Sequence, residues 1–154
     1  MPFRDYQPAD FPRLCEIDRL CFPPGIAYPP LGMAAILRRR GRLAIVVENA
    51  RGVIVAFVAA HLLRRGQAHI ITLDVLPRYR GKGIGRELLL RSEGRLRDAG
   101  ARSIRLETAA GNRAAQTLYL SLGYTFVKVM PRYYASGEDA WVMEKLLESS
   151  RVRP

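Results

Sequence analysis

The spacing of apolar residues changes several times along the chain, and each change marks a different predicted element. Near the N-terminus apolar residues recur at every third position, which predicts a helix, and Asp10 is placed to cap its start. The apolar positions of this helix are Phe11, Leu14, Ile17 and Leu20. Prolines crowd residues 21–30, so we expect a stiff loop there before a second short helix, Leu31 to Arg39.

The middle of the chain is rich in branched apolar residues, which is typical of strands. We expect three strands here, at Leu43–Glu48, Val53–Leu63 and Ala68–Val75. The turns between them are short and contain glycine, so the three strands should pair in antiparallel fashion.

Helix and strand patterns alternate in the second half of the chain. Apolar residues line one face of a helix between Gly83 and Gly100, and Asn112 is placed to cap another helix that stops at Gly123. Three further strands are predicted, at Ser103–Thr108, Tyr124–Met130 and Trp141–Lys145.

The order of these elements predicts the fold class. Two helices precede an antiparallel meander and a β–α–β–α–β–β run, which favours one α/β domain of the α+β type. Its central sheet should be mixed, largely antiparallel and flanked by helices. We expect the domain to span residues 1–147 and residues 148–154 to form a flexible tail.

The composition adds a strong positive charge to this picture. There are 25 basic residues against 14 acidic ones, a net charge of +11, which favours an anionic partner: nucleic acid, a phosphorylated cofactor or an acidic protein surface. The chain has no apolar run of about 18 residues and no secretory h-region. Cys15 and Cys21 suit neither a disulfide framework nor a zinc cluster. We therefore expect a cytoplasmic protein without bound metal or membrane association.

Three glycines open the helix that follows the meander. They leave backbone N–H groups unshielded at a helix N-terminus, where the helix dipole also favours anions. These glycines are Gly81, Gly83 and Gly85. Arg80, Lys82 and Arg86 add positive side chains, so the turn is suited to hold a pyrophosphate. No Ser or Thr follows Lys82, which excludes a Walker loop, and the preceding meander does not suit a Rossmann fingerprint. From this pattern alone, a glycine-rich connection without a ligand stays open.

This turn and the residues after it resemble the GNAT acetyltransferase superfamily. Arg80-x-x-Gly83-x-Gly85 is similar to the acetyl-CoA pyrophosphate loop of that superfamily, and Leu118-Tyr119-x-x-Leu122-Gly123-Tyr124 is similar to the second half of its fold. Within the superfamily the chain resembles the RimI-type protein N-alpha-acetyltransferases. The narrower resemblance rests on Leu73-Asp-Val75, Glu107 before Tyr119, Arg132-Tyr-Tyr134, Glu138-Asp-Ala140 with Met143, and Cys21-Phe-Pro23. It covers about residues 43–145 and implies a β–α–β core that binds acetyl-CoA.

The resemblance implies two catalytic residues. Glu107 would be the general base for the incoming amine, and Tyr119 the general acid that protonates the leaving thiolate. The family attacks the thioester directly, so no reactive cysteine is needed. From the residues alone, Glu107 is alternatively a surface carboxylate paired with Arg105 or Arg113, and Tyr119 a core aromatic. A carboxylate base suits an α-amine, with a pKa of about 7.7–8, better than a lysine, with a pKa of about 10.4.

The resemblance also implies the binding residues. Those expected to bind acetyl-CoA are Leu73, Asp74, Val75, Arg80, Gly81, Lys82, Gly83, Ile84, Gly85, Arg86, Asn112 and Tyr119. Asn112 is alternatively only a helix cap. The residues expected around the acceptor are Phe22, Tyr28, Tyr133 and Tyr134. The loop departs from bacterial RimI-type members, because Pro24, Gly25 and Ile26 stand where a tryptophan is common. His61 and His69 lie in apolar strands and are expected to be core or sheet-face residues.

The sequence thus predicts an N-acetyltransferase that moves acetyl from acetyl-CoA to a primary amine. The preferred acceptor is the N-terminal α-amine of a protein, such as a ribosomal one, and the enzyme is a monomer or homodimer. One alternative is the same fold acting on a lysine side chain or a small-molecule amine. Another is a non-catalytic module that binds RNA or ribosomes. Direct nucleic-acid binding is not expected, since the chain lacks the basic and aromatic platforms of common RNA modules.

Overall fold

The structure, a computed structural model, describes residues 1–148. Its helices are α1 (Phe11–Cys21), α2 (Pro30–Arg38), α3 (Ile84–Asp98) and α4 (Arg113–Ser121). Its strands are β1 (Phe3–Asp5), β2 (Arg42–Glu48), β3 (Ile54–Leu62), β4 (Gln67–Val75), β5 (Ser103–Ala109), β6 (Thr125–Met130) and β7 (Ala140–Leu146). Every predicted helix and strand is present, with ends that agree to within two residues. Apart from Glu148, the expected tail lies outside the described residues.

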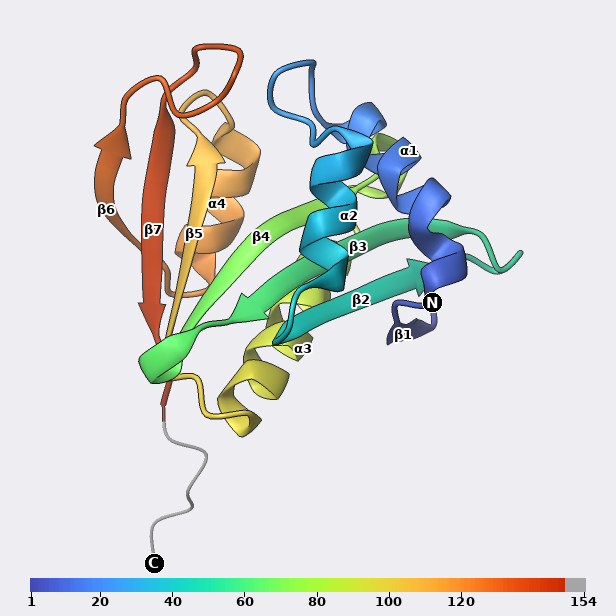
Figure 1. The fold of residues 1–154 in the computed structure, drawn as a ribbon, viewed down its shortest axis with the longest axis horizontal. Helices are drawn as coiled ribbons and strands as arrows, with labels where there is room; N and C mark the ends of the chain where they lie inside the picture. The colour runs from blue at the N-terminus through green and yellow to red at the C-terminus, as the bar shows by residue number, and fades with distance from the viewer. Residues whose placement is uncertain (149–154) are drawn as a thin grey trace, which may run out of the picture.

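All seven strands belong to one sheet, in the order β1-β2-β3-β4-β5-β7-β6. Each neighbouring pair is antiparallel except the central β4–β5 pair, which is parallel. A parallel pair needs a crossover, and α3 supplies it. Figure 1 shows α1 and α2 on one face of the sheet and α3 behind it. The mixed, largely antiparallel sheet flanked by helices confirms the predicted fold class.

The two parallel strands separate along their length. Only residues 67–70 of β4 pair with β5, at residues 103–106, and beyond them the strands diverge (Figure 1). A β-bulge marks this point, because Ala60 opposes Ile70 on β4 whereas Ala59 opposes Thr72. Ile71 is therefore the extra residue. A one-residue shift moves side chains to the other face of a strand. It turns Leu73 and Val75 toward the same core that Ile70 enters before the bulge.

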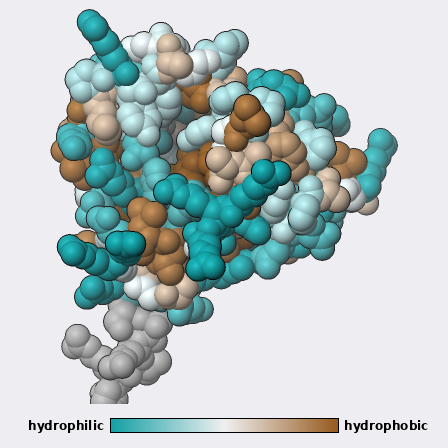
Figure 2. All heavy atoms as spheres, in the orientation of Figure 1, coloured by the Kyte–Doolittle hydropathy of each residue, from teal (hydrophilic) through white to brown (hydrophobic). Residues whose placement is uncertain are grey.

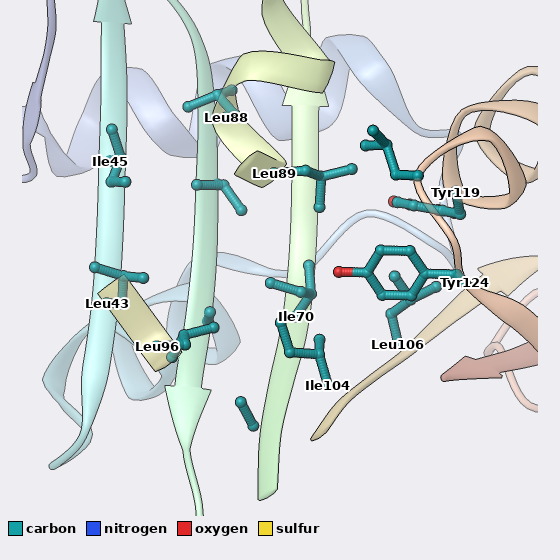
Figure 3. Close-up of a cluster of buried hydrophobic side chains, with 14 of the residues drawn as sticks. Leu43, Ile45, Ile70, Leu88, Leu89, Leu96, Ile104, Leu106, Tyr119 and Tyr124 are labelled. Carbon is teal, nitrogen blue, oxygen red and sulfur yellow. The ribbon is translucent and has the colours of Figure 1, made fainter. Parts of the chain in front are cut away.

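The sheet separates two apolar cores. The larger core lies between the sheet and the helices α3 and α4, and its cluster includes Leu88 and Leu89 of α3 together with Ile70 and Ile104 of the central strands (Figure 3). The smaller core, on the other face, holds Leu14, Ile17, Met33, Leu37, Val46 and Phe57 from α1, α2 and the first strands. The cores thus fix α3 and α4 to one face of the sheet and α1 and α2 to the other face.

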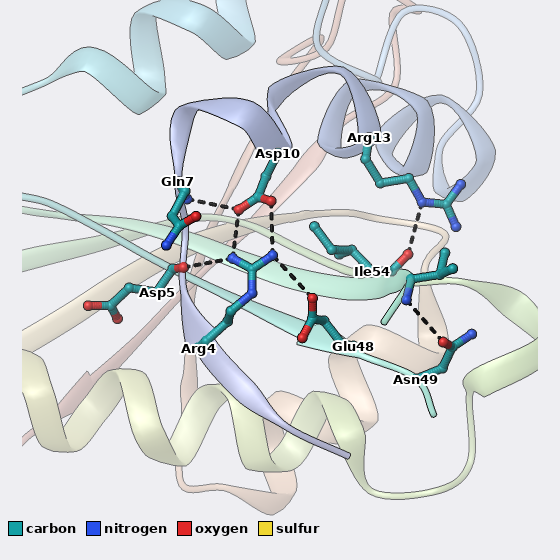
Figure 4. A network of polar contacts seen from close by, with 9 residues as sticks. Arg4, Asp5, Gln7, Asp10, Arg13, Glu48, Asn49 and Ile54 are labelled. Carbon is teal, nitrogen blue, oxygen red and sulfur yellow. Dashed lines mark hydrogen bonds and ion pairs between the residues drawn. The ribbon is translucent and has the colours of Figure 1, made fainter. Parts of the chain in front are cut away.

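At the N-terminus one strand was not predicted and one expectation is wrong. Strand β1 was not anticipated, because three residues at an edge carry no apolar period. Asp10 does not cap α1: its backbone is already helical, and its carboxylate accepts from both Arg4 guanidinium nitrogens, at 2.8 and 2.9 Å, and from the Gln7 N–H at 2.8 Å (Figure 4). Arg4 also reaches Glu48 on β2 at 3.3 Å. Asp10 therefore ties β1 and the following turn to α1.

Candidate active site

The diverging halves of β4 and β5 open a cleft of about 620 Å³. Its walls come from β4, the start of α3, α4 and the loop after α1. Figure 2 shows apolar atoms on the floor of a recess in the upper part of this view, between the side that carries β5–β7 and the side that carries the N-terminal helices. Ten of the residues predicted to bind the cofactor line the cleft: Leu73, Val75, Arg80, Gly81, Gly83, Ile84, Gly85, Arg86, Asn112 and Tyr119.

The glycine-rich turn forms one end of the cleft. Gly81 and Gly83 have φ angles of +76° and +82°, in the left-handed region that glycine adopts without strain. A Cβ on either residue would meet nothing within 4 Å, so the space beside their backbone is open. Gly83 is the N-cap of α3, and the first N–H groups of a helix have no partner inside it. The turn therefore presents free backbone donors and the positive end of the α3 dipole to the cleft.

Two predicted cofactor residues lie outside the lining of the cleft. Asp74 is completely buried, with its side chain on the opposite face of β4 from Leu73 and Val75. Lys82 stands 5.6 Å from the ring centre of Tyr79. Their roles toward the cofactor stay predictions, with no cleft contact to support them.

Some backbone groups at the end of β4 already make hydrogen bonds within the protein. The Leu76 N–H donates to Val55 O at 3.0 Å, so it is not free for a ligand. Val75 O accepts from Arg80 Nε at 2.8 Å and from Cys21 Sγ at 3.4 Å. This contact fixes the Arg80 side chain beside the glycine turn, where its remaining guanidinium nitrogens can meet an anion.

A second, smaller cavity of about 80 Å³ adjoins the cleft on the β5 side. All four predicted acceptor residues line it, namely Phe22, Tyr28, Tyr133 and Tyr134. Two loops bring them together: residues 22–29 and residues 131–139, which touch where Ser136 N donates to Gly25 O at 3.3 Å (Figure 1). A side chain at position 25 would collide with Ser136 at 2.7 Å, so this approach requires glycine.

Glu107 lies in the smaller cavity with its side chain 11% exposed. Its Oε1 accepts from His69 Nε2 at 2.7 Å and from the Tyr133 hydroxyl at 3.4 Å, and Arg105 Nε stands 3.5 Å from Oε2. Burial raises the pKa of Glu107, but the His69 hydrogen bond and the charges of His69 and Arg105 outweigh it, so the pKa falls below its ordinary 4.5. Glu107 is therefore an ionised hydrogen-bond acceptor in the wall of the cavity. It is also paired with Arg105, as expected for the alternative in which Glu107 is a carboxylate held by a neighbouring arginine.

Tyr119 lies where the two cavities meet. Its side chain belongs to α4, it is 7% exposed, and it lines both spaces. The ring packs edge-on against Tyr124 at 5.8 Å (Figure 3). Burial and the Asp74 charge raise the pKa of Tyr119 above 10, which keeps the phenol protonated at neutral pH. Within residues 1–148 its hydroxyl makes no hydrogen bond, unlike that of Tyr124, which donates to Glu93 at 2.9 Å. A protonated, unshared hydroxyl at this junction is suited to donate to a leaving group.

Asn112 combines both of the roles considered for it. Its side chain accepts from Ala115 N at 3.2 Å and so caps α4, while the residue also lines both cavities. The cap fixes the first turn of α4 and therefore the position of Tyr119, two turns further along the same helix, relative to the two cavities.

Sequence reasoning missed His69 as a site residue. The expectation that it is a sheet-face histidine holds, but its ring also contacts the predicted base. The parallel register places His69 opposite Arg105, two residues from Glu107 on the same face of the sheet. The alternation of polar and apolar residues in each strand shows which residues share a face of the sheet. It does not show which residues of the two parallel strands lie opposite each other, and the contact depends on that register. His61 is buried as expected and contacts Ile36 O and Arg39.

No group of three or more His, Cys, Asp or Glu side chains between residues 1 and 148 is arranged to hold a metal ion. No helix in this part of the chain is both long and apolar enough to cross a membrane.

Comparison with known sequences gives a consistent picture. The pattern of the acetyltransferase (GNAT) family matches residues 11–124. An N-alpha-acetyltransferase of Saccharolobus solfataricus is 32% identical over 152 residues, which is 90% of this chain and 88% of that protein. An uncharacterised Mycobacterium leprae protein is 44% identical over 81 residues, 51% of this chain but 21% of its own length. For an N-alpha-acetyltransferase of Sulfurisphaera tokodaii, 40% identical, the match spans 53% of this chain and 48% of that protein.

Solved structures share the fold. The Escherichia coli ribosomal-protein-S18-alanine N-acetyltransferase superposes with a TM-score of 0.86 at 24% identity, covering 99% of this chain and 97% of the other. A Salmonella typhimurium acetyltransferase solved with its cofactor acetyl-CoA gives a TM-score of 0.80 at 23% identity, covering 100% and 98%.

Proposed function

The chain belongs to the GNAT acetyltransferase family, and we propose that it transfers acetyl from acetyl-CoA to the N-terminal α-amine of a protein. One observation carries this proposal: two cavities share Tyr119 in their walls, one lined by the glycine turn and one lined by Glu107. An acetyl donor and an amine acceptor must meet in this way for direct transfer. The Saccharolobus relative, named an N-alpha-acetyltransferase, supports the choice of acceptor.

The larger cleft fits acetyl-CoA as the co-substrate. Open space beside Gly81 and Gly83, free amides at the start of α3, and Arg80 and Arg86 suit a pyrophosphate. The walls toward Tyr119 are apolar, with Leu73, Val75 and Leu118 from β4 and α4, which suits the uncharged pantetheine arm.

Glu107 and Tyr119 divide the proton transfers. The Glu107 carboxylate, held ionised by His69 and Arg105, takes the proton of the acceptor amine directly or through a water. The neutral amine then attacks the thioester carbonyl, so that the C–N bond forms and the C–S bond breaks while the Tyr119 hydroxyl gives its proton to the departing sulfur. The second proton of the new amide nitrogen returns through solvent to the Tyr119 phenolate, and Glu107 releases its proton to solvent, which leaves the amide, the free thiol and the enzyme in its starting protonation state. An α-amine favours this step, because about a tenth of it is neutral at pH 7, against less than about a thousandth of a lysine amine.

The acceptor cavity favours a chain end over a bulky side chain. It is small, about 80 Å³, and the rings of Tyr28, Tyr133 and Tyr134 face it. Such a site holds the first residue of an extended peptide, with the rest of the chain leaving between the two loops. The Escherichia coli neighbour is named a ribosomal-protein-S18-alanine N-acetyltransferase, and we extend the proposal to a ribosomal acceptor. The same proposal places the enzyme in the cytoplasm, where Cys15 and Cys21 stay free thiols.

An acceptor panel tests the proposal. The purified protein is incubated with acetyl-CoA and peptides with free N-termini, the same peptides N-blocked with an internal lysine, and polyamines, while thiol release is followed. We expect turnover only with free N-termini. Turnover confined to lysine peptides or to polyamines would overturn the acceptor assignment, and no turnover with any amine would overturn the activity. The variant Glu107→Gln is the matched control for background hydrolysis.

A further inference from the structure

Two aspartates lie completely buried against each other beside the site. Asp18, on α1, and Asp74, on β4, are both 0% exposed. The bulge at Ile71 turns Thr72 and Asp74 away from the cleft and toward α1. The two carboxyl groups lie within hydrogen-bonding reach of each other. Neither residue takes part in the proton transfers described above.

Each carboxyl group has one satisfied and one unsatisfied oxygen. Asp18 Oδ2 accepts from the Tyr28 backbone N–H at 2.6 Å, and Asp74 Oδ1 accepts from the Thr72 hydroxyl. Asp18 Oδ1 and Asp74 Oδ2 are fully buried and have no partner among the described residues. Ionised carboxylates only accept hydrogen bonds, so two facing carboxylates would leave both oxygens unpaired. A single proton between them satisfies both.

No group among residues 1–148 replaces that proton. Within residues 1–148, the Thr72 hydroxyl donates to the pair, and the titratable groups close enough to interact with it electrostatically are Cys15, Cys21, Tyr28, Tyr119 and Arg80. Only Arg80 is a cation, and it is exposed, with its Nε bound to Val75 O. Two buried like charges at hydrogen-bonding distance cannot both ionise at neutral pH. Burial and the neighbouring Asp18 accordingly raise the pKa of Asp74 well above its ordinary value.

We propose that Asp18 and Asp74 share one proton at neutral pH and that this bridge holds the loop of residues 22–29 in place, which makes Asp18 a positioning residue for the acceptor. The loop is attached to α1 through the Tyr28 N–H, and it carries Phe22 and Tyr28 into the acceptor cavity. The acceptor part of this inference rests on the proposed function, whereas the shared proton does not.

The stability of the protein across pH tests the shared proton without any substrate. A proton bound in the folded state but lost on unfolding makes the unfolding constant rise up to about tenfold per pH unit, between the ordinary aspartate pKa of about 3.9 and the raised value of the pair. Asp18→Asn and Asp74→Asn each place an amide N–H where the proton lies. We expect the wild type to lose stability relative to each asparagine variant as pH rises above the ordinary aspartate pKa of about 3.9, and each asparagine variant to have the flatter profile. Parallel profiles for all three proteins would overturn the shared proton.

Infrared spectroscopy gives a second readout. At neutral pH the wild type should show the carbonyl stretch of a protonated, buried carboxyl group, and Asp74→Asn should lack it. The same spectrum in both proteins would contradict the proposal.

Steady-state kinetics test the positioning role. Asp18→Ala removes the acceptor for the Tyr28 N–H, so we expect the KM for the peptide to rise about tenfold with little change in the KM for acetyl-CoA, and Asp18→Asn to restore it. An equal rise in both KM values, or no rescue by asparagine, would refute positioning. If Asp18→Ala does not fold, the peptide KM of the wild type across pH decides: it should rise as the pair loses its proton, and that rise should be absent in Asp18→Asn. Failure of these kinetics with an intact stability result would overturn the positioning role and leave the proton bridge standing, whereas failure of the proposed acceptor would appear separately, as turnover confined to lysine peptides or polyamines in the acceptor panel.

Discussion

Two neighbouring tyrosines should respond in opposite ways to the loss of one hydroxyl. Tyr119 and Tyr124 are both buried, and their rings pack edge-on at 5.8 Å. Tyr119 lines both cavities and its hydroxyl binds no described protein group, whereas the Tyr124 hydroxyl donates to Glu93 at 2.9 Å. A phenylalanine keeps the ring contact in both cases, so the substitutions differ only in what the hydroxyl does.

The magnitudes follow from these contacts. Tyr119→Phe removes the proposed general acid, and we expect kcat to fall about 10²–10⁴-fold, with a free energy of unfolding within about 0.5 kcal/mol of the wild type. Tyr124→Phe leaves a Glu93 oxygen without its donor, and Glu93 is 2% exposed. Since Lys145 still holds the other Glu93 oxygen at 2.8 Å, we expect a loss of about 1–3 kcal/mol in stability and an unchanged kcat.

Thiol release with a free N-terminal peptide measures kcat, and urea denaturation measures stability. Each variant serves as the control for the other, because both remove the same atom from the same aromatic cluster. Wild-type turnover in Tyr119→Phe would refute the acid role. An equal loss of kcat in both variants would show that the effect comes from packing in the cluster and not from proton donation.

Four further outcomes follow from the site and the N-terminus. Glu107→Gln should lower kcat by about 10²-fold or more. Because the pKa of Glu107 is lowered, the wild-type rate should rise with pH toward the α-amine pKa of about 8, with no titration of Glu107 visible near neutral pH. A titration step near neutral pH in the kcat/KM profile would contradict this. Arg80→Gln should raise the KM for acetyl-CoA about tenfold and leave the peptide KM unchanged, as initial rates at varied acetyl-CoA would reveal. Gly83→Ala should cost about 1–2 kcal/mol in urea denaturation, since φ is +82° there, and a neutral result would argue against that backbone conformation. Arg4→Met should lower the free energy of unfolding by about 2–3 kcal/mol and leave kcat unchanged. The Arg4 hydrogen bond lowers the pKa of Asp10, so the stability that Asp10 contributes should be present above about pH 4 and be lost as the pH falls below the lowered pKa.

The fold was largely predictable because its elements are long and periodic. Apolar spacing and glycines at the ends of elements predict the meander, the helix after Gly83 and the last strands. Strand β1 has three residues and only an edge position, so no period exists to detect. Asp10 looked like a helix cap, but a short turn precedes α1 and Arg4, brought near by β1, takes the carboxylate instead. Long-range pairing overrides local capping there.

The site was predictable only in part, since its two halves depend on different information. The glycine turn is a local motif, and its residues were found together. The contact between His69 and Glu107 needs the register of a parallel pair, and the pairing of Asp18 with Asp74 needs the bulge at Ile71, which reverses the faces of β4. A polar residue inside the apolar stretch at Asp74 was a signal of an unusual environment, but its partner, Asp18, lies on a helix more than 50 residues earlier in the chain.

Internal competition within one peptide tests the central claim most directly. A peptide that carries both a free N-terminus and a lysine side chain is incubated with the protein and acetyl-CoA, and tandem mass spectrometry locates the acetyl group. The account predicts acetyl on the α-nitrogen and none on the lysine at early times. Acetyl on the lysine with a free α-amine would contradict it.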